Sequence, residues 1–202
     1  MKTRLKLSYN SPVILTYCAI CLVCLIVNSI TGNWFNRMFL VCYGHPSLLD
    51  PLTYLRLFSY AFGHSGVSHF TGNMIMMLLV GPIAEEKYGS FNLAVMIAVT
   101  ALAGGILNSV FFSTGLIGAS GIVFMLIILC AFTGMKRGEI PLTLILVAVA
   151  YLGQEVYDGL FTTDNVSHFG HLVGGVSGLV FGILYHKKKF ALNTGGGYTS
   201  LK

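Results

Sequence analysis

Three side chains that could act as nucleophile, base or hydrogen-bond donor occupy equivalent places in three apolar stretches. Each lies 16 residues before a charged residue that ends its apolar run: His69 before Glu85, Ser120 before Lys136, and His171 before Lys187. At 1.5 Å per residue this spacing is about 24 Å of helix, less than the roughly 30 Å hydrocarbon core of a bilayer. Polar groups at such a depth are costly and normally face one another or a water-filled cavity. The spacing therefore predicts one polar site shared by three membrane-spanning helices.

The chemistry that these residue types support is nucleophilic attack by a serine. A serine hydroxyl needs a base at neutral pH, and a histidine within hydrogen-bond reach is the usual one. The acidic residues Glu155 and Asp158 lie near the outer end of a later apolar stretch, not at this depth. We therefore expect a catalytic dyad of Ser120 and His171 without a third, carboxylate member.

Hydrogen-bond donors for a developing oxyanion are available beside the serine. The backbone N–H of Ser120 would lie at a helix N-terminus, where the helix dipole also favours negative charge. Asn73 follows His69 by four residues, so the two side chains share a helix face. We expect the Ser120 amide, Asn73 and His69 to form an oxyanion hole.

Ser120 itself lies among small residues, in Gly118-Ala119-Ser120-Gly121 at the start of the apolar run 122–132. Taken alone, this motif is explained by close helix packing. The depth of Ser120 means, however, that the chain enters the membrane as a loop before it becomes helical. Non-helical backbone at that depth survives only against protein or a water-filled cavity. Residues 115–119 therefore imply such a cavity.

The apolar stretch that carries His171 has a glycine face. Gly174, Gly178 and Gly182 lie on the same side of the helix as His171, and such a face lets another backbone approach closely. A packing face with an incidental histidine is the structural alternative. His168, one turn earlier, is the rival base, and we interpret it as a gate or a hydrogen-bond neighbour.

The composition indicates a polytopic membrane protein. Of 202 residues, 55% are hydrophobic and 9% charged, with a mean hydropathy of +0.78. The formal charge of +5 comes from basic residues at the ends of apolar runs, which favours a role in topology over nucleic-acid binding. Cys18, Cys21 and Cys24 lack a second pair at ligand spacing, so we expect them to pack and not to bind metal. No cofactor is implied.

The apolar pattern predicts an all-α fold with six membrane spans: residues 13–30, 67–83, 91–112, the helix that begins at Ser120, 140–156 and 168–186. Ten of the twelve Lys and Arg residues lie on the side of the termini, so the positive-inside rule places both termini in the cytoplasm. We expect a cytoplasmic segment (1–10), a membrane domain (11–187) with a long external loop (31–65), and a disordered cytoplasmic tail (188–202).

These motifs together resemble the rhomboid family of intramembrane serine proteases over about residues 10 to 187. The matching patterns are His-x-x-x-Asn, Gly-x-Ser-Gly and His-x-x-Gly-x-x-x-Gly, at residues 69–73, 118–121 and 171–178. His64 and the turn at residues 85–89 fit as well. The resemblance implies a six-helix fold with Ser120 as nucleophile, His171 as base, and Asn73, His69 and the Ser120 amide as oxyanion hole.

The sequence departs from the family pattern at two places. Leu55-Arg56 stands where the family has Trp-Arg, a change that bears on how the external loop is anchored. Phe124 stands one turn after the serine, where the family often has Tyr, and it removes a phenol hydroxyl near His171. Neither change affects the dyad.

The most specific hypothesis is a membrane protease whose site opens to the extracytoplasmic side of the cell membrane. It would hydrolyse peptide bonds in or next to transmembrane segments of membrane protein substrates. One alternative is a catalytically silent relative that binds membrane clients without cutting them. Another is a small transporter that uses His69, Asn73 and His171 as a polar relay.

Overall fold

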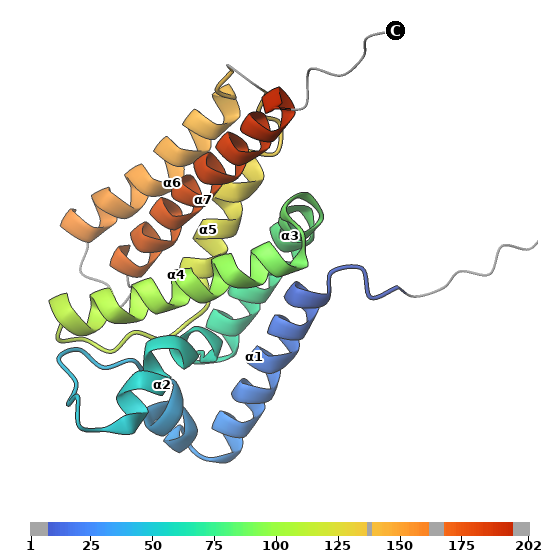
Figure 1. The fold of residues 1–202 in the computed structure, drawn as a ribbon. Helices are drawn as coiled ribbons and strands as arrows, with labels where there is room; N and C mark the ends of the chain where they lie inside the picture. Colours follow the sequence, from blue (N-terminus) through green and yellow to red (C-terminus); the bar gives the residue numbers. More distant parts are fainter. Residues whose placement is uncertain (1–7, 137–138, 162–167, 196–202) are drawn as a thin grey trace, which may run out of the picture.

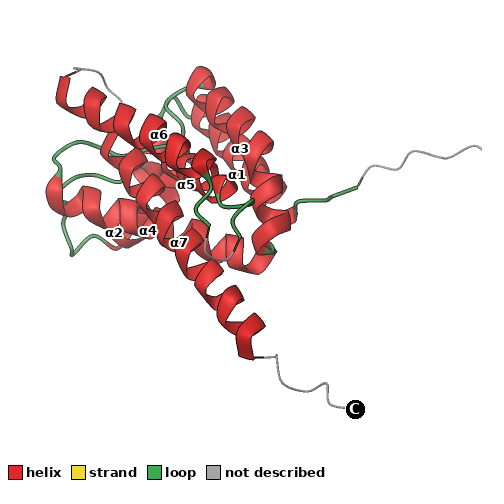
Figure 2. Cartoon of the chain, turned by 90° about the horizontal axis from the view of Figure 1, so that it is seen from above, coloured by secondary structure: helices red, strands yellow, loops and turns green. Residues whose placement is uncertain are grey.

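The computed structural model describes residues 8–136, 139–161 and 168–195. Within these ranges the regular secondary structure is helical, and the β-structure consists of one isolated bridge between Cys42 and Leu116. The elements in chain order are α1 (Pro12–Ile30), the π-helix η1 (Asn36–Leu40), α2 (Pro51–Ser59), the 3-10 helix η2 (Tyr60–Phe62), α3 (Val67–Tyr88), α4 (Ser90–Phe111), α5 (Ser120–Ala131), α6 (Leu142–Phe161) and α7 (His168–Gly195) (Figure 1). Figure 2 shows this arrangement of helices and loops from above.

Among the described residues, four helices are long and apolar enough to cross a membrane: α1, α3, α4 and the 168–187 portion of α7. Helix α5 and the 142–154 part of α6 are apolar but shorter. This agrees with an all-α polytopic membrane protein. The six-span count and the cytoplasmic placement of both termini stay predictions.

Helix α5 lies at the centre of the bundle. It packs against α3, α4, α6 and α7, and it buries seven apolar side chains, Ile122, Val123, Met125, Leu126, Ile127, Ile128 and Leu129. A helix that is apolar all round must be enclosed by other elements or by lipid. The serine at the start of α5 is therefore held by a helix that contacts four others.

The glycine face of α7 packs directly on α5, as the sequence predicts. A Cβ added at Gly174 would lie 1.9 Å from the carbonyl oxygen of Gly121, and one at Gly178 would lie 2.7 Å from the carbonyl oxygen of Met125. Only glycine permits backbones to approach this closely. Figure 1 shows α7 running alongside α6, and the contacts of Gly174, Gly178 and Gly182 show that α7 packs along the length of α5.

Glu85 joins α1 to α3. Its two carboxylate oxygens accept hydrogen bonds from the backbone N–H groups of Val13 and Ile14, each at 3.1 Å, and one of them also accepts from the Ser90 hydroxyl at 2.7 Å. Glu85 is buried. It thus caps the N-terminus of α1, where backbone N–H groups lack helical partners. Hydropathy marks Glu85 only as the end of a span and does not reveal this role.

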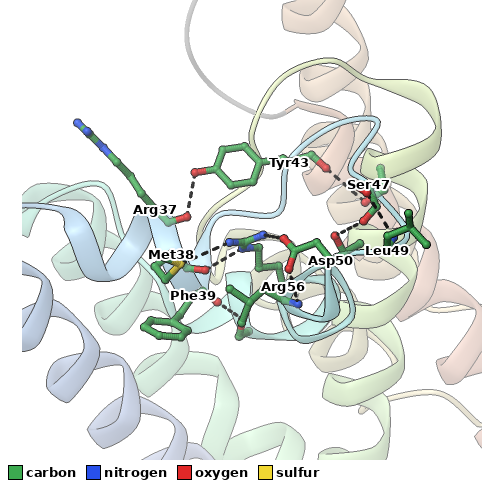
Figure 3. Close-up of polar contacts among 12 residues, drawn as sticks. Arg37, Met38, Phe39, Tyr43, Ser47, Leu49, Asp50 and Arg56 are labelled. Carbon is green, nitrogen blue, oxygen red and sulfur yellow. Dashed lines mark hydrogen bonds and ion pairs between the residues drawn. The ribbon is translucent and has the colours of Figure 1, made fainter.

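The external connection is folded around Arg56 (Figure 3). The guanidinium forms an ion pair with Asp50 at 2.9 Å, donates to the Met38 carbonyl oxygen at 2.8 Å, and lies 5.4 Å from the centre of the Tyr43 ring. Asp50 also caps α2 by accepting from the Leu52 N–H. Arg56 therefore anchors this connection although Leu55 replaces the tryptophan of the family pattern.

The expected disordered tail is partly wrong. Helix α7 continues through the lysine run to Gly195, so residues 188–195 are helical. Phe190, Ala191 and Leu192 are compatible with a helix, and the first glycine cluster begins only at Gly195. The rest of the predicted tail, 196–202, and the first seven residues lie outside the described residues.

Candidate active site

A cavity of about 740 Å³ opens beside the N-terminus of α5. It is lined by Ser65, Gly66, Val67, Ser68, His69, Asn73, Gly115, Ile117, Ser120 and His171. The four polar side chains for which the sequence predicts one site therefore share one cavity. Gly115 and Ile117 come from the loop before α5. This is the non-helical segment whose depth in the membrane predicts a cavity.

Ser120 is the first residue of α5. The preceding Gly118 has φ = +133°, a conformation that favours glycine. A Cβ at Gly118 would also lie 2.7 Å from the His69 Cε1 atom. The loop is fixed by the Gly118 N–H, which donates to the Tyr60 carbonyl oxygen at 3.0 Å. The backbone thus presents the Ser120 hydroxyl and the free N–H groups of the first helical turn to the cavity.

His171 reaches the cavity from α7. Its ring is stacked on the ring of Phe124, with centroids 4.5 Å apart and planes inclined by 7°. Phe124 follows Ser120 by four residues, so its ring packs against the imidazole from the face of α5 that carries Ser120. A parallel ring fixes the imidazole plane by shape, without a hydroxyl.

His168 does not line the cavity described above. Its ring lies edge-on to that of His171, with centroids 6.4 Å apart. Of these two histidines, His171 lines the cavity with Ser120, and His168 lies beside His171.

His69 and Asn73 enter the cavity from α3. One ring nitrogen of His69, Nδ1, is hydrogen-bonded to the Ser65 hydroxyl at 3.0 Å, so the opposite edge of the ring faces Gly118. The Asn73 side chain is buried and uses one amide hydrogen to bond the His69 carbonyl oxygen at 2.9 Å. An Asn amide carries a second hydrogen, which remains available to a ligand.

Ser65 is the site residue that the sequence analysis did not identify. It orients His69 from the turn before α3, four residues upstream. That i, i+4 spacing of a hydroxyl and an imidazole was the signal that could have revealed it. Within the described part of the chain, no group of three or more His, Cys, Asp or Glu side chains is arranged to hold a metal ion.

Chemically, the cavity brings together a hydroxyl, an imidazole and several hydrogen-bond donors. The hydroxyl and the imidazole are the components of a nucleophile and its base. The helix N-terminus, His69 and Asn73 are donors of the kind that stabilise negative charge on a tetrahedral intermediate. The arrangement suits acyl transfer.

Known proteins of related sequence identify the family of this chain. The family model of the rhomboid domain matches residues 51–188. The chain is 30% identical over 185 residues to the rhomboid protease GlpG of Serratia proteamaculans. The aligned region covers 88% of this chain and 62% of that protein. It is 27% identical over 183 residues to the rhomboid protease GluP of Bacillus subtilis, covering 86% of this chain and 36% of that protein.

A eukaryotic relative matches a shorter region. The chain is 32% identical over 143 residues to the rhomboid-related protein 1 of Caenorhabditis elegans, covering 65% of this chain and 40% of that protein. The chain thus spans less than two thirds of the length of each of these relatives. Because the rhomboid domain covers more than half of its sequence, this multi-pass membrane protein belongs to the rhomboid family.

Proposed function

We propose that this protein is an intramembrane serine endopeptidase that hydrolyses peptide bonds in or next to transmembrane segments of other membrane proteins. The observation that carries the proposal is the shared cavity: it joins Ser120 at a helix N-terminus to His171, whose ring is held by Phe124. The relatives named as rhomboid proteases in two bacteria support the same reaction class.

In the first half of the reaction, the Ser120 hydroxyl attacks the scissile carbonyl carbon and its proton passes to His171. This requires the Ser120 Oγ within about 2.6–3.2 Å of a ring nitrogen of His171 in the substrate complex. The carbonyl oxygen becomes an oxyanion bound by the Ser120 N–H, the free Asn73 amide hydrogen and His69. His171 then protonates the leaving amine, the C–N bond breaks, and an acyl-enzyme remains.

In the second half, water attacks the ester carbon while His171 accepts its proton. The same donors hold the second oxyanion, and collapse of this intermediate returns the proton to the Ser120 oxygen. No step requires a metal ion or an organic cofactor. The substrate backbone must be extended at the cut site, because the carbonyl groups of an intact helix are enclosed by that helix and would not reach Ser120 in the cavity.

The proposed topology has six spans, cytoplasmic termini and a site that opens to the extracytoplasmic side of the cell membrane. In this topology α5 is short because its N-terminus starts inside the bilayer, where residues 116, 118 and 119 of the preceding loop are buried in the protein. The lipid bilayer and transmembrane protein substrates are the proposed partners. The long apolar helices α1, α3, α4 and α7 are consistent with this placement.

The transporter hypothesis is less well supported. A polar relay would need polar groups that continue past the cavity toward the opposite end of the bundle. Instead, α5 buries only apolar side chains beyond its first turn. Between Asn73 and the α1 cap Glu85, α3 buries Met74, Met77, Gly81 and Ala84, none of which has a polar side chain. The cavity therefore suits a site that receives water from one side.

Cleavage of a transmembrane reporter in proteoliposomes tests the proposal and separates it from client binding without cleavage. The purified protein should cut the reporter, whereas Ser120→Ala should bind it without cutting. Equal product formation by both proteins would refute the serine mechanism. Reporter binding without any product from the unmodified protein would favour the silent relative.

A further inference from the structure

The ring of His69 is held by the residue four positions before it in the chain. Its Nδ1 atom lies 3.0 Å from the Ser65 hydroxyl oxygen and accepts a hydrogen bond from the Ser65 backbone N–H at 3.5 Å. His69 is the third residue of α3, which begins at Val67. A side chain at this position can reach back to a backbone N–H at the start of the helix, as in a capping box. Ser65 therefore offers two donors to one ring nitrogen.

The backbone contact decides which nitrogen of His69 carries the proton. A backbone N–H only donates, so Nδ1 must be the acceptor. A hydroxyl can donate or accept, and opposite an accepting Nδ1 the Ser65 hydroxyl donates. A neutral imidazole has one ring proton, and the hydrogen bond made by one nitrogen determines whether the other carries it. The ring proton of neutral His69 therefore lies on Nε2.

The Nε2 edge of the ring faces the loop that leads to the serine. A Cβ added at Gly118 would lie 2.9 Å from Nε2 but 3.9 Å from Nδ1 of His69. Gly118 precedes Ser120 by two residues, and His69 and Ser120 line the same cavity. An N–H at Nε2 is thus a donor on the side of the ring that faces the nucleophile. With the proton on Nδ1, a nitrogen lone pair would stand there instead and would repel a developing negative charge.

The buried histidine behind this ring supplies shape without charge. His64 is 1% exposed and meets the His69 ring edge-on, with centroids 5.2 Å apart. Burial lowers the pKa of His64 to about 4, so His64 places no positive charge against His69 at neutral pH. Among the described residues, the hydrogen bonds to the His69 ring come from Ser65 alone. Ser65 is therefore the residue in position to set the tautomer of His69.

We propose that Ser65 is a positioning residue of the candidate active site, which holds His69 as the Nε2–H tautomer and so keeps that N–H directed to the oxyanion. Ser65 acts on the reaction only through His69. Its role in catalysis rests on the proposed protease function, whereas the tautomer of His69 does not.

Nuclear magnetic resonance of the ¹⁵N-histidine-labelled protein in nanodiscs measures the tautomer, because protonated and unprotonated ring nitrogens have well-separated ¹⁵N chemical shifts. The signals of His69 are assigned by their loss in His69→Phe. At neutral pH we expect a protonated Nε2 and an unprotonated Nδ1. Ser65→Ala should raise the ratio of the Nδ1–H to the Nε2–H form by about three- to tenfold, the equivalent of one net hydrogen bond, whereas Ser65→Thr keeps the hydroxyl and should keep the ratio. A protonated Nδ1 in the unmodified protein, or the same ratio in Ser65→Ala, would overturn the proposal.

Cleavage of the transmembrane reporter measures the consequence for the reaction. An oxyanion donor acts in the transition state, so Ser65→Ala should lower kcat by about three- to tenfold with KM nearly unchanged. Ser65→Thr should retain most of the rate. Because Ser65 is exposed, Ser65→Ala creates no internal cavity and should stay folded. Equal losses of kcat in Ser65→Ala and Ser65→Thr, or an effect on KM alone, would contradict the positioning role.

Ser29→Ala is the matched control for the loss of a serine hydroxyl. Ser29 is also exposed, and its hydroxyl donates to the Leu25 carbonyl oxygen within α1 at 2.8 Å. This variant should leave both the His69 tautomer and kcat unchanged, and effects equal to those of Ser65→Ala would refute a specific role of Ser65.

The two measurements separate this proposal from the proposed function. A tautomer that depends on Ser65 in a protein that never cuts the reporter would refute the protease function and support the hold of Ser65 on His69. Normal cleavage together with a tautomer that is independent of Ser65 would refute the role of Ser65 and leave the protease function standing.

Discussion

The Gly174→Ala substitution should separate the two helices that carry the proposed dyad. The added Cβ would lie 1.9 Å from the Gly121 carbonyl oxygen, whereas ordinary contact begins at 3.4 Å. The backbones of α5 and α7 must therefore move apart by about 1.5 Å. Gly121 follows Ser120 directly, and Gly174 lies one turn after His171, so the displacement acts at the site itself.

The size of the expected effect follows from this displacement. A serine to histidine hydrogen bond of about 2.6–3.2 Å would lengthen beyond 4 Å, and a misplacement of about 1 Å can cost roughly 10²-fold in rate. We therefore expect kcat to fall by about 100-fold or more. Overpacking of this kind also lowers the free energy of unfolding by about 1–3 kcal/mol, so thermal unfolding must show that the variant is folded.

The assay is cleavage of a transmembrane reporter in proteoliposomes, with Gly72→Ala as matched control. Gly72 lies inside α3 next to Asn73, and a Cβ there would meet no described heavy atom within 4 Å. This control should cleave normally and be slightly more stable, because alanine favours helix. A folded Gly174→Ala protein that cleaves within a few-fold of the unmodified rate would refute the close-packing argument.

Three further predictions concern residues around the site. Glu85→Ala should lower the free energy of unfolding by about 2 kcal/mol or more, since it uncaps α1, while the activity per folded molecule stays constant. Thermal unfolding in detergent measures the loss of stability, and equal melting temperatures for the two proteins would contradict the capping role. Phe124→Leu should lower kcat by up to about tenfold, because an aromatic stack contributes about 0.5–1.5 kcal/mol. Phe124→Tyr keeps the ring and should preserve kcat, so an equal loss of kcat in both variants would contradict a stacking role. Because the folded chain holds the pKa of His64 near 4 and the unfolded chain protonates it near 6.5, the free energy of unfolding should fall as pH drops from about 6.5 to 4, by up to roughly 3 kcal/mol. His64→Phe should lack that part of the loss, and an identical pH profile in the two proteins would disprove it.

The parts of the site that the sequence predicts rest on local periodicity. The i, i+4 spacing of His69 and Asn73 and the glycine spacing after His171 follow from helix geometry. The common depth of His69, Ser120 and His171 follows from their equal distance to the charged residue that ends each apolar run. These regularities correctly place Ser120, His171, His69 and Asn73 on one cavity.

The parts that the sequence does not reveal depend on contacts between distant segments. The Glu85 carboxylate caps α1 by accepting from backbone N–H groups 72 and 71 residues earlier in the chain, and hydropathy treats Glu85 only as a charge at a boundary. The anchoring of the external connection by Arg56 likewise needs the partners Asp50 and Met38 to be folded around it. The apolar pattern gives the span at residues 168–186 but not the further helical turns to Gly195, because a lysine run ends an apolar span without ending the helix.

Mass spectrometry after treatment with a fluorophosphonate probe tests the central claim most directly, since the probe reports which hydroxyl is an activated nucleophile. We expect one adduct, on Ser120, that is lost in His171→Ala and retained in His168→Ala. An adduct on another residue, or labelling of Ser120 that persists in His171→Ala and disappears in His168→Ala, would contradict the assignment of nucleophile and base.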